Sequence, residues 1–215
     1  MIKVVLLDFD GVLVDSLDIK THAFVHLFRN YPEGTRQQIR DLHLNNLGVS
    51  RYEKFRIILK EFLNQPVSEE KLEKLASEFS RFCIEKVIAA PYIKGAYEFI
   101  SQHYRNYSLY VVSSTPETEL QLILEKRGIR KYFKGAYGTP KKKSEICRLI
   151  IEKDGLPPSS VVLVGDAVSD LEAAQQCGLH FIARLDETAT NPLAKRELKF
   201  RLPDLSTLNE VCSRI

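Results

Sequence analysis

Acidic residues stand directly behind two apolar runs of this 215-residue chain. Asp8 and Asp10 follow the run IKVVLL, and Asp166 and Asp170 follow the run VVLVG. Because a buried strand gains no stability from acids at its end, these carboxylates are candidates for chemistry. If the four groups meet, their repulsion favours a bound divalent cation, and ligation by oxygen alone favours Mg²⁺. The sequence therefore predicts an acidic metal site.

A second polar stretch follows another apolar run and has the character of an anion-binding turn. Ser113 and Ser114 come after SLYVV, and Thr115 and Pro116 are suited to the cap and the first position of a helix. Such a helix start is often only structural, but it also directs free N–H groups toward an anion. The lysines at 141–143 precede a further helical segment, so one of them is expected on the same side.

Four short apolar runs, rich in β-branched residues, are expected to be strands. Their residues are near-continuously apolar, which is typical of strands buried on both faces of a parallel sheet. The predicted strands are residues 2–8, 108–113, 161–165 and 180–183.

Helical segments separate the last three predicted strands. They span residues 117–127, 143–154 and 170–177, and each is followed by a glycine, the usual residue after a helix end. Strands that alternate with helices predict an α/β fold with a doubly wound, mostly parallel sheet. In such sheets ligands bind outside the carboxyl ends of the strands, which is where the acids lie.

A long helical insertion is expected between the first two strands. Ser68 is a good N-cap for a helix over residues 68–88, whose apolar residues recur every three or four positions, and residues 51–63 have the same character. We therefore predict a core domain formed by residues 1–15 and 91–215, with a helical cap domain at 16–90.

Composition excludes several other classes of protein. The net charge of +3 is spread along the chain, and the lysine run at 141–143 is more typical of a solvated surface than of nucleic-acid binding. The four cysteines form no CxxC pair, which favours reduced, mostly buried thiols in a cytoplasmic protein. No apolar span is long enough to cross a membrane. The sequence assigns no oligomeric state.

The ordered motifs resemble those of the haloacid dehalogenase superfamily, in its Mg²⁺-dependent phosphatase branch. The resemblance rests on DFDGVLVDS (8–16), VVSSTP (111–116), a lysine in PKKKSE (140–145) and VGDAVSD (164–170). It covers the whole chain, including an insertion after the first motif. It implies the same Rossmann-like core with a helical cap, an essential Mg²⁺ and a small phosphate ester as substrate.

The resemblance also implies a role for each matching residue of the first motif. Asp8 would attack phosphorus and form an aspartyl phosphate, and Asp10 would act as general acid and then as general base. Asp8 and Asp10 would also bind the metal, Asp10 through its main-chain carbonyl. Gly11 would allow the backbone to approach the phosphate.

The later motifs imply the phosphate and metal ligands. Ser113 and Ser114 would hold phosphoryl oxygens, and Asp166 and Asp170 would complete the metal site, with Asp170 orienting either a water or the lysine. Lys143 is preferred as the lysine because it stands two residues before Glu145, but Lys141 and Lys142 remain alternatives.

The same resemblance narrows the range of possible reactions and substrates. Dehalogenases of the superfamily generally lack the second Asp of the first motif, so Asp10 favours a phosphatase, similar to phosphoglycolate phosphatase or to phosphatases of sugar pathways. Arg51 in GVSRYEKF (48–55) is a candidate for contact with the distal end of the substrate, or else a surface residue. A β-phosphoglucomutase-like mutase is the alternative, although His22 lies two residues late for the mutase histidine. A non-catalytic phosphate-binding relative would lack a motif residue, and this chain lacks none.

Overall fold

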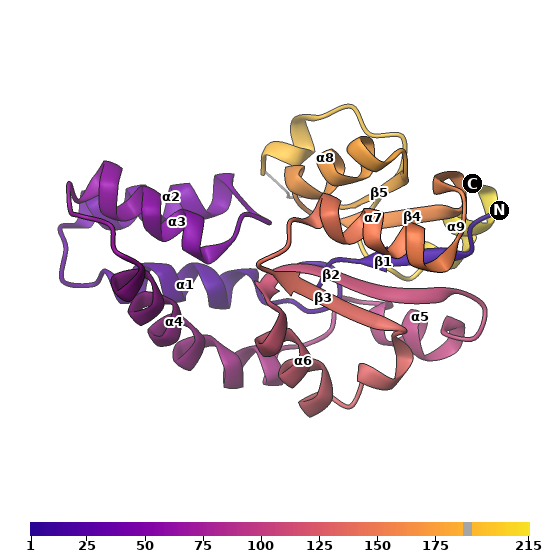
Figure 1. The fold of residues 1–215 in the computed structure, drawn as a ribbon, viewed down its shortest axis with the longest axis horizontal. Coiled ribbons are helices and arrows are strands. Elements are labelled where there is room, and N and C mark those ends of the chain that lie inside the picture. Colours follow the sequence, from indigo (N-terminus) through magenta and orange to yellow (C-terminus); the bar gives the residue numbers. More distant parts are fainter. Residues whose placement is uncertain (187–190) are drawn as a thin grey trace.

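The computed structural model describes residues 1–186 and 191–215 of the chain. Within them, six strands form one parallel sheet in the order β3-β2-β1-β4-β5-β6 (Figure 1). The strands are β1 (Val4–Leu7), β2 (Ser108–Pro116), β3 (Gly135–Thr139), β4 (Val161–Gly165), β5 (His180–Arg184) and β6 (Arg201–Leu202).

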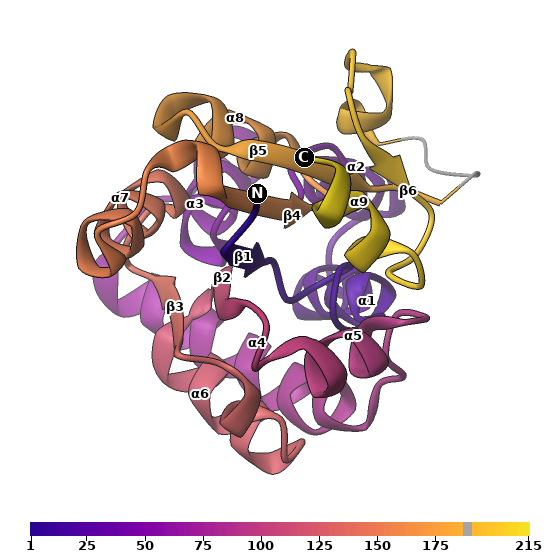
Figure 2. The ribbon, with the colours of Figure 1, turned by 90° about the vertical axis from the view of Figure 1, so that its right-hand side faces the viewer.

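Helices cover both faces of the sheet, as the apolar strands require (Figure 2). Val4 and Leu6 pack on the side of α7 and α8, whereas Val5 and Leu7 face the opposite side. The core helices are α5 (Ala96–His103), α6 (Glu117–Lys126), α7 (Lys143–Asp154), α8 (Val168–Cys177) and α9 (Leu208–Arg214). Short 3₁₀ turns lie at Arg130–Tyr132 (η2), Pro158–Ser160 (η3) and Pro192–Lys195 (η4).

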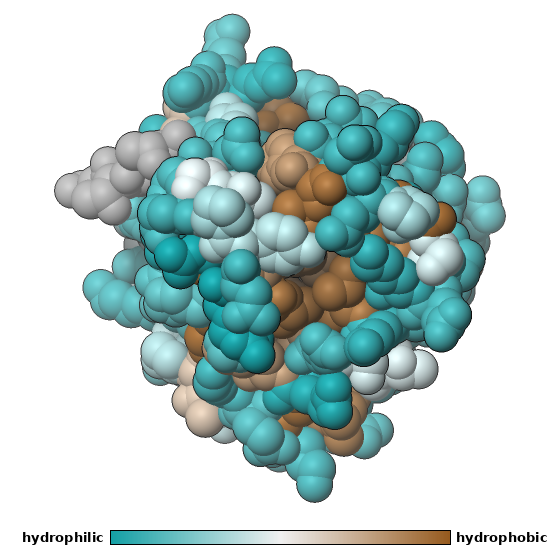
Figure 3. Space-filling view, turned by 90° about the vertical axis from the view of Figure 1, so that its left-hand side faces the viewer, coloured by the Kyte–Doolittle hydropathy of each residue, from teal (hydrophilic) through white to brown (hydrophobic). Residues whose placement is uncertain are grey.

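The remaining helices lie beyond the carboxyl edge of the sheet (Figure 1). They are α1 (Leu17–Leu27), α2 (Glu33–Asn45), α3 (Arg51–Ile57), a π-helical turn η1 (Ile58–Phe62) and α4 (Glu69–Ala89). Phe24, Phe55 and Phe79 meet at their centre, with ring centroids 4.7–6.1 Å apart. Figure 3 views the end of the molecule that these helices form, where hydrophobic residues gather between hydrophilic ones.

The predicted α/β fold and its parallel sheet are confirmed, and the structure adds two strands. β3 contains two glycines in five residues and β6 has only two residues, so neither has the apolar, β-branched pattern of the others. The predicted helix at 51–63 is interrupted, because α3 passes into the π turn η1. Pro116, rather than Thr115, is the N-cap of α6.

Local signals were more reliable for the ends of the other helices. The Ser68 hydroxyl accepts a hydrogen bond from the Lys71 N–H and begins α4. Gly155 and Gly178 end α7 and α8 in the left-handed conformation, at φ of 61° and 67°.

All four cysteines are free. None of the helices in the described ranges is both long and apolar enough to span a membrane.

Candidate active site

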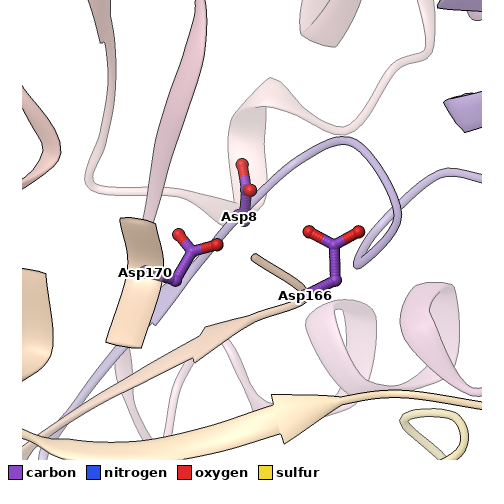
Figure 4. A group of neighbouring side chains, drawn as sticks. All are labelled: Asp8, Asp166 and Asp170. Carbon is purple, nitrogen blue, oxygen red and sulfur yellow. The ribbon is translucent and has the colours of Figure 1, made fainter. Parts of the chain in front are cut away.

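The strand order brings the predicted acids together at one edge of the sheet. β1 lies beside β4 with Leu7 opposite Val164, so Asp8 and Asp166 leave neighbouring strands at nearly the same level. Asp170 adds its carboxylate from the first turn of α8 (Figure 4). One carboxylate oxygen from each of these three residues lies within 4.8 Å of the others, and all three side chains are buried.

Lys143 is the lysine that enters this acidic cluster. Its Nζ donates to Asp8 Oδ2 at 2.6 Å and to Asp170 Oδ1 at 2.5 Å, and its side chain is only 5% exposed. Although burial alone would lower the pKa of Lys143, the carboxylates of Asp170 and Asp8 raise it above its usual value. The charged form of Lys143 is thus favoured between two acids.

The other two lysines of the run lie elsewhere. Lys141 Nζ is 4.0 Å from Glu117 Oε2, and both of these side chains are partly exposed. Lys142 is the N-cap of α7, and its main-chain N–H donates to Glu145 Oε2 at 3.1 Å. The preference for Lys143, which was based on its spacing to Glu145, agrees with this geometry. Lys143 is the first residue of α7 and is the lysine of the run that contacts Asp8 and Asp170.

One lysine does not balance three buried carboxylates. Burial first, and then the neighbouring acids, raise the pKa of Asp166 well above its usual range. Burial raises the pKa of Asp8 to about 7, although Lys143 opposes the shift. The cluster is therefore short of positive charge, as expected of a site built for a cation.

The free oxygen in the cluster belongs to Asp166. Among the residues that the structure describes, Asp166 Oδ2 is buried without a hydrogen-bond partner. Both oxygens of Asp170 are engaged, one by Lys143 and the other by the Ala167 N–H at 3.2 Å. An all-oxygen set with an unpaired, buried carboxylate fits Mg²⁺, with Asp166 as a direct ligand and Asp170 orienting the lysine.

Residue 11 must be a glycine because the Asp166 carboxylate fills the space that a side chain would need. Its φ is +75°, and a Cβ at this position would lie 2.2 Å from Asp166 Oδ2. Any side chain at position 11 would therefore displace the free carboxylate.

Asp10 has its own set of partners, separate from those of the three acids. Ser16 donates to Asp10 Oδ1 at 2.6 Å, and Thr115 donates to Oδ2 at 3.1 Å. Lys20 forms an ion pair with the same Oδ2 and donates to Thr115 Oγ1 at 2.8 Å. Burial would raise the pKa of Asp10, but Lys20 and these hydrogen bonds outweigh it and lower the pKa.

Sequence reasoning missed Lys20 and Thr115 as neighbours of Asp10. The available signal was weak: Ser16 and Lys20 are one helical turn apart at the start of α1, so both face the same direction. Thr115 was considered only as a helix cap, which it is not.

Ser113 and Ser114 lie at the end of β2 and line the same cavity as Asp8 and Asp10. The Ser113 hydroxyl is buried and accepts from the Thr115 N–H at 3.1 Å. The Ser114 hydroxyl donates to the main-chain oxygen of Gly48, in the loop before α3. Gly48 also lies against Ser169, so this loop touches the core at two points.

The cavity is closed on its other side by side chains from the inserted helices. Leu17, Phe24 and Leu47 contribute apolar surface, and the polar wall on this side consists of Lys20, His43, Arg51 and Lys54. The sheet side is therefore mainly acidic, whereas the helical side is mainly basic.

Arg51 lines this cavity, but its charge is already paired. Its guanidinium makes two hydrogen bonds to the Glu119 carboxylate, at 2.8 and 2.9 Å, and one to Ser80 Oγ at 2.6 Å. Glu119 lies on α6, so the pair joins the inserted helices to the core. The structure thus places Arg51 in a buried ion pair, not free to face a substrate.

The parallel α/β sheet and the acidic site at its edge define a hydrolase of the haloacid dehalogenase type. Residues 5–184 match the haloacid dehalogenase-like hydrolase family, and this chain belongs to that family. The curated relatives are named as phosphatases. The chain is 26% identical to a phosphorylated carbohydrates phosphatase of Thermotoga maritima over 84% of this chain and 83% of the relative. It is also 26% identical to a phosphoglycolate phosphatase of Vibrio cholerae, over 98% and 96%.

Solved structures share the same fold. CbbY from Rhodobacter sphaeroides, solved in complex with phosphate, superposes with a TM-score of 0.74 at 19% identity and covers 97% of this chain and 96% of its own. A haloacid dehalogenase-like family hydrolase from Streptococcus pneumoniae gives 0.71 at 17% identity, over 100% and 99%.

Proposed function

We propose that this protein is a Mg²⁺-dependent phosphatase that hydrolyses a small phosphorylated metabolite through an aspartyl phosphate on Asp8. The observation that carries the proposal is the position of Asp8, which lies between Lys143 and the free Asp166 carboxylate in one cavity with Asp10. The names of the relatives support a phosphoglycolate-like substrate or a sugar phosphate.

Asp8, Asp166 and the main-chain carbonyl of Asp10 would hold the magnesium ion, with Asp170 fixing Lys143 beside them. When bound, the cation would neutralise the carboxylates and so let one of them approach a phosphate dianion. Lys143 adds the second positive charge on the opposite side of Asp8. Ser113 and Ser114 would hold phosphoryl oxygens at the end of β2.

The first half-reaction transfers the phosphoryl group to the protein. A carboxylate oxygen of Asp8 forms a bond to phosphorus while the bond from phosphorus to the ester oxygen breaks. Asp10 in its protonated form gives its proton to the departing oxygen, so the product leaves as an alcohol.

The second half-reaction restores the protein. Asp10, now ionised, takes a proton from a water that attacks the phosphorus of the aspartyl phosphate, and the bond to Asp8 breaks. Inorganic phosphate leaves and Asp10 is again protonated. Lys20 and the hydroxyls of Ser16 and Thr115 favour the ionised form of Asp10 that this step needs.

The inserted helices act as a cap in this proposal. Residues 16–90 would form the cap domain, and residues 1–15 and 91–215 the core domain that carries the chemistry. The contact of Ser114 with Gly48 and the pair of Arg51 with Glu119 correspond to a closed arrangement, which would exclude water during transfer.

The test is turnover of p-nitrophenyl phosphate by wild type and by Asp8→Asn. An amide is a poor nucleophile, so Asp8→Asn is expected to lose about 10⁴-fold or more in kcat while keeping its circular dichroism spectrum and melting temperature. EDTA should stop wild-type turnover, and added Mg²⁺ should restore it. Retention of a tenth of wild-type activity by Asp8→Asn would show that Asp8 is not the nucleophile.

Product analysis separates the phosphatase from the mutase. With β-glucose 1-phosphate as substrate, we expect release of inorganic phosphate that equals the glucose formed. Conversion to glucose 6-phosphate would instead identify a mutase.

A further inference from the structure

Lys54 is a buried lysine on the helical side of the cavity. It lies on α3, one turn after Arg51, and is only 3% exposed. Within residues 1–186 and 191–215, no carboxylate forms an ion pair with it. Its ammonium group is 3.0 Å from His43 Nδ1 and 5.4 Å from the centre of the Phe24 ring. A buried cation without a counterion is costly, so its retention at a cavity wall suggests that a ligand supplies the missing charge.

His43 extends the same site. It is 4% exposed, and burial followed by the charge of Lys54 lowers its pKa well below the usual value, which favours the neutral ring. Since the Lys54 ammonium can only donate, Nδ1 of His43 is the acceptor and Nε2 carries the proton. Among the described residues this Nε2 is buried without a partner. The cavity wall therefore contains an unused N–H donor beside an unpaired ammonium group.

Arg51 does not compete with Lys54 for a ligand. Both terminal nitrogens of its guanidinium donate to the Glu119 carboxylate, and one of them also donates to Ser80. The positive charge of Arg51 is thus balanced within the protein, whereas that of Lys54 is not.

We propose that Lys54 and His43 bind a second anionic group of the substrate, at the end opposite the phosphate that Asp8 attacks. This inference rests on the proposed phosphatase function and narrows its substrate class to small phosphate monoesters that carry a carboxylate or a second phosphate. Asp8 and Asp10 line the same cavity as Lys54 and His43, so one small molecule can reach both sites.

The electrostatics of Lys54 agree with this geometry. Burial, and then the charge of Lys20, lower the pKa of Lys54 to about 7. A bound anion would reverse this effect and keep the ammonium group charged. The charged groups that act on Lys54 are Lys20, Asp10 and Asp166 from other elements and Arg51 from its own helix.

The proposal is tested by binding, separately from turnover. Isothermal titration calorimetry with the Mg²⁺-loaded full-length protein would compare non-hydrolysable phosphonates in matched sets. Phosphonoacetate and 3-phosphonopropionate carry a carboxylate, methylene- and ethylene-diphosphonate carry a second phosphonate, and ethyl- and propylphosphonate carry neither. We expect wild type to bind at least one of the ligands with a second anion about 10- to 100-fold more tightly than its matched alkylphosphonate. Whether the carboxylate or the diphosphonate series shows this ratio identifies the second anion.

Variants assign the ratio to Lys54. Lys54→Met keeps the length of the side chain and removes its charge, and should bring the ratio of affinities to within about threefold of one. Lys54→Arg should retain part of it. Lys60→Met is the control, because Lys60 is also a lysine of the inserted helices but its side chain is 77% exposed, and this variant should keep the wild-type ratio. Melting temperatures would confirm that each variant is folded.

The outcomes distinguish this inference from the proposed function. A wild-type ratio near one in every set, or a ratio that persists in Lys54→Met, would overturn the anion site even if p-nitrophenyl phosphate is hydrolysed. A ratio that depends on Lys54 in a protein that hydrolyses no phosphate ester would support the site and overturn the phosphatase.

Discussion

At the scale of single residues, Asp10 is held in its ionised form by neighbours from two distant parts of the chain. Lys20 lies on α1 and Thr115 at the end of β2, and both contact the same carboxylate oxygen. These contacts lower the pKa of Asp10 despite its burial. The arrangement would favour the general-base role that we propose for Asp10 in the second half-reaction.

Lys20→Met is expected to move the acid limb of the pH profile of kcat to higher pH. Burial raises the pKa of Asp10, and the ammonium group of Lys20 counteracts this effect. Without the ammonium group the pKa of Asp10 rises, so the ionised form is lost at a higher pH as the pH falls. Activity should therefore decline several-fold more at pH 5 than at pH 8. The profile would be measured with p-nitrophenyl phosphate, with Lys60→Met as the control. Parallel profiles for Lys20→Met and wild type would show that Lys20 does not set the protonation of Asp10.

At the scale of elements, α6 and the residue after it form ion-pair and hydrogen-bond contacts with the inserted helices α3 and α4. Glu119 near the start of α6 pairs with Arg51 of α3 and accepts from Ser80 of α4 at 2.6 Å. Arg127, directly after α6, donates to the main-chain oxygens of Val87, Ile88 and Ala90 at the end of α4, at 2.7–2.9 Å. The second contact satisfies carbonyls that a helix end leaves unpaired.

Arg51→Ala is expected to lower the free energy of unfolding by about 3–5 kcal/mol, because it leaves the buried Glu119 carboxylate without its partner. In the double variant Arg51→Met/Glu119→Leu, where both charges are removed, the loss should be much smaller. Urea denaturation of wild type, Arg51→Met, Glu119→Leu and the double variant would measure the coupling between the two residues.

The same variants test the sequence-based hypothesis for Arg51. If Arg51 serves mainly to join the helices to α6, Arg51→Ala should reduce kcat/KM by a similar factor for p-nitrophenyl phosphate and for phosphoglycolate. A loss confined to phosphoglycolate would instead support direct contact between Arg51 and the distal anion.

At the scale of the whole molecule, the acidic site costs stability unless a cation occupies it. The pKa of Asp8 is raised to about 7 and that of Asp166 is raised well above its usual value. For a carboxyl group with a raised folded-state pKa, the contribution to stability is full below the unfolded-state pKa and is lost as pH rises through the folded-state value. Without metal, the protein should therefore become less stable between about pH 4 and pH 8.

Mg²⁺ is expected to raise the melting temperature by roughly 5–10 °C at pH 8 when present at about 100 times its Kd, and by clearly less at pH 5. At pH 5 Asp8, whose pKa is about 7, is largely protonated, and the raised pKa of Asp166 favours its protonated form too, so the pair repels less and binds metal less well. Asp166→Asn should be more stable than wild type in EDTA at pH 8 and should respond less to Mg²⁺. Differential scanning calorimetry would measure these shifts, and equal shifts at both pH values would contradict this account.

The sequence alone determined which residues could do chemistry and on what kind of scaffold. Strands such as VVLVG are buried on both faces, so their apolar residues are continuous and their ends are marked by the first acids. The parallel arrangement then places Asp8, Asp166 and the serines at the end of β2 at one edge. The capping residue Ser68 located the start of α4, and the glycines located the ends of α7 and α8. The preference for Lys143 came from its spacing to Glu145 in the resembling motif. All these inferences depend on neighbours within a few residues.

Only the tertiary structure decided which of the remaining charges meet. Lys20 contacts Thr115, Arg51 pairs with Glu119, and Lys54 meets His43 instead of an acid. These contacts depend on how α1, α2 and α3 are rotated and packed against each other and against the core. That packing results from many small apolar contacts, so no local sequence pattern reveals it. Physically, the strand ends are fixed by backbone hydrogen bonding, whereas the partners of a long, flexible side chain are fixed only when the helices have packed.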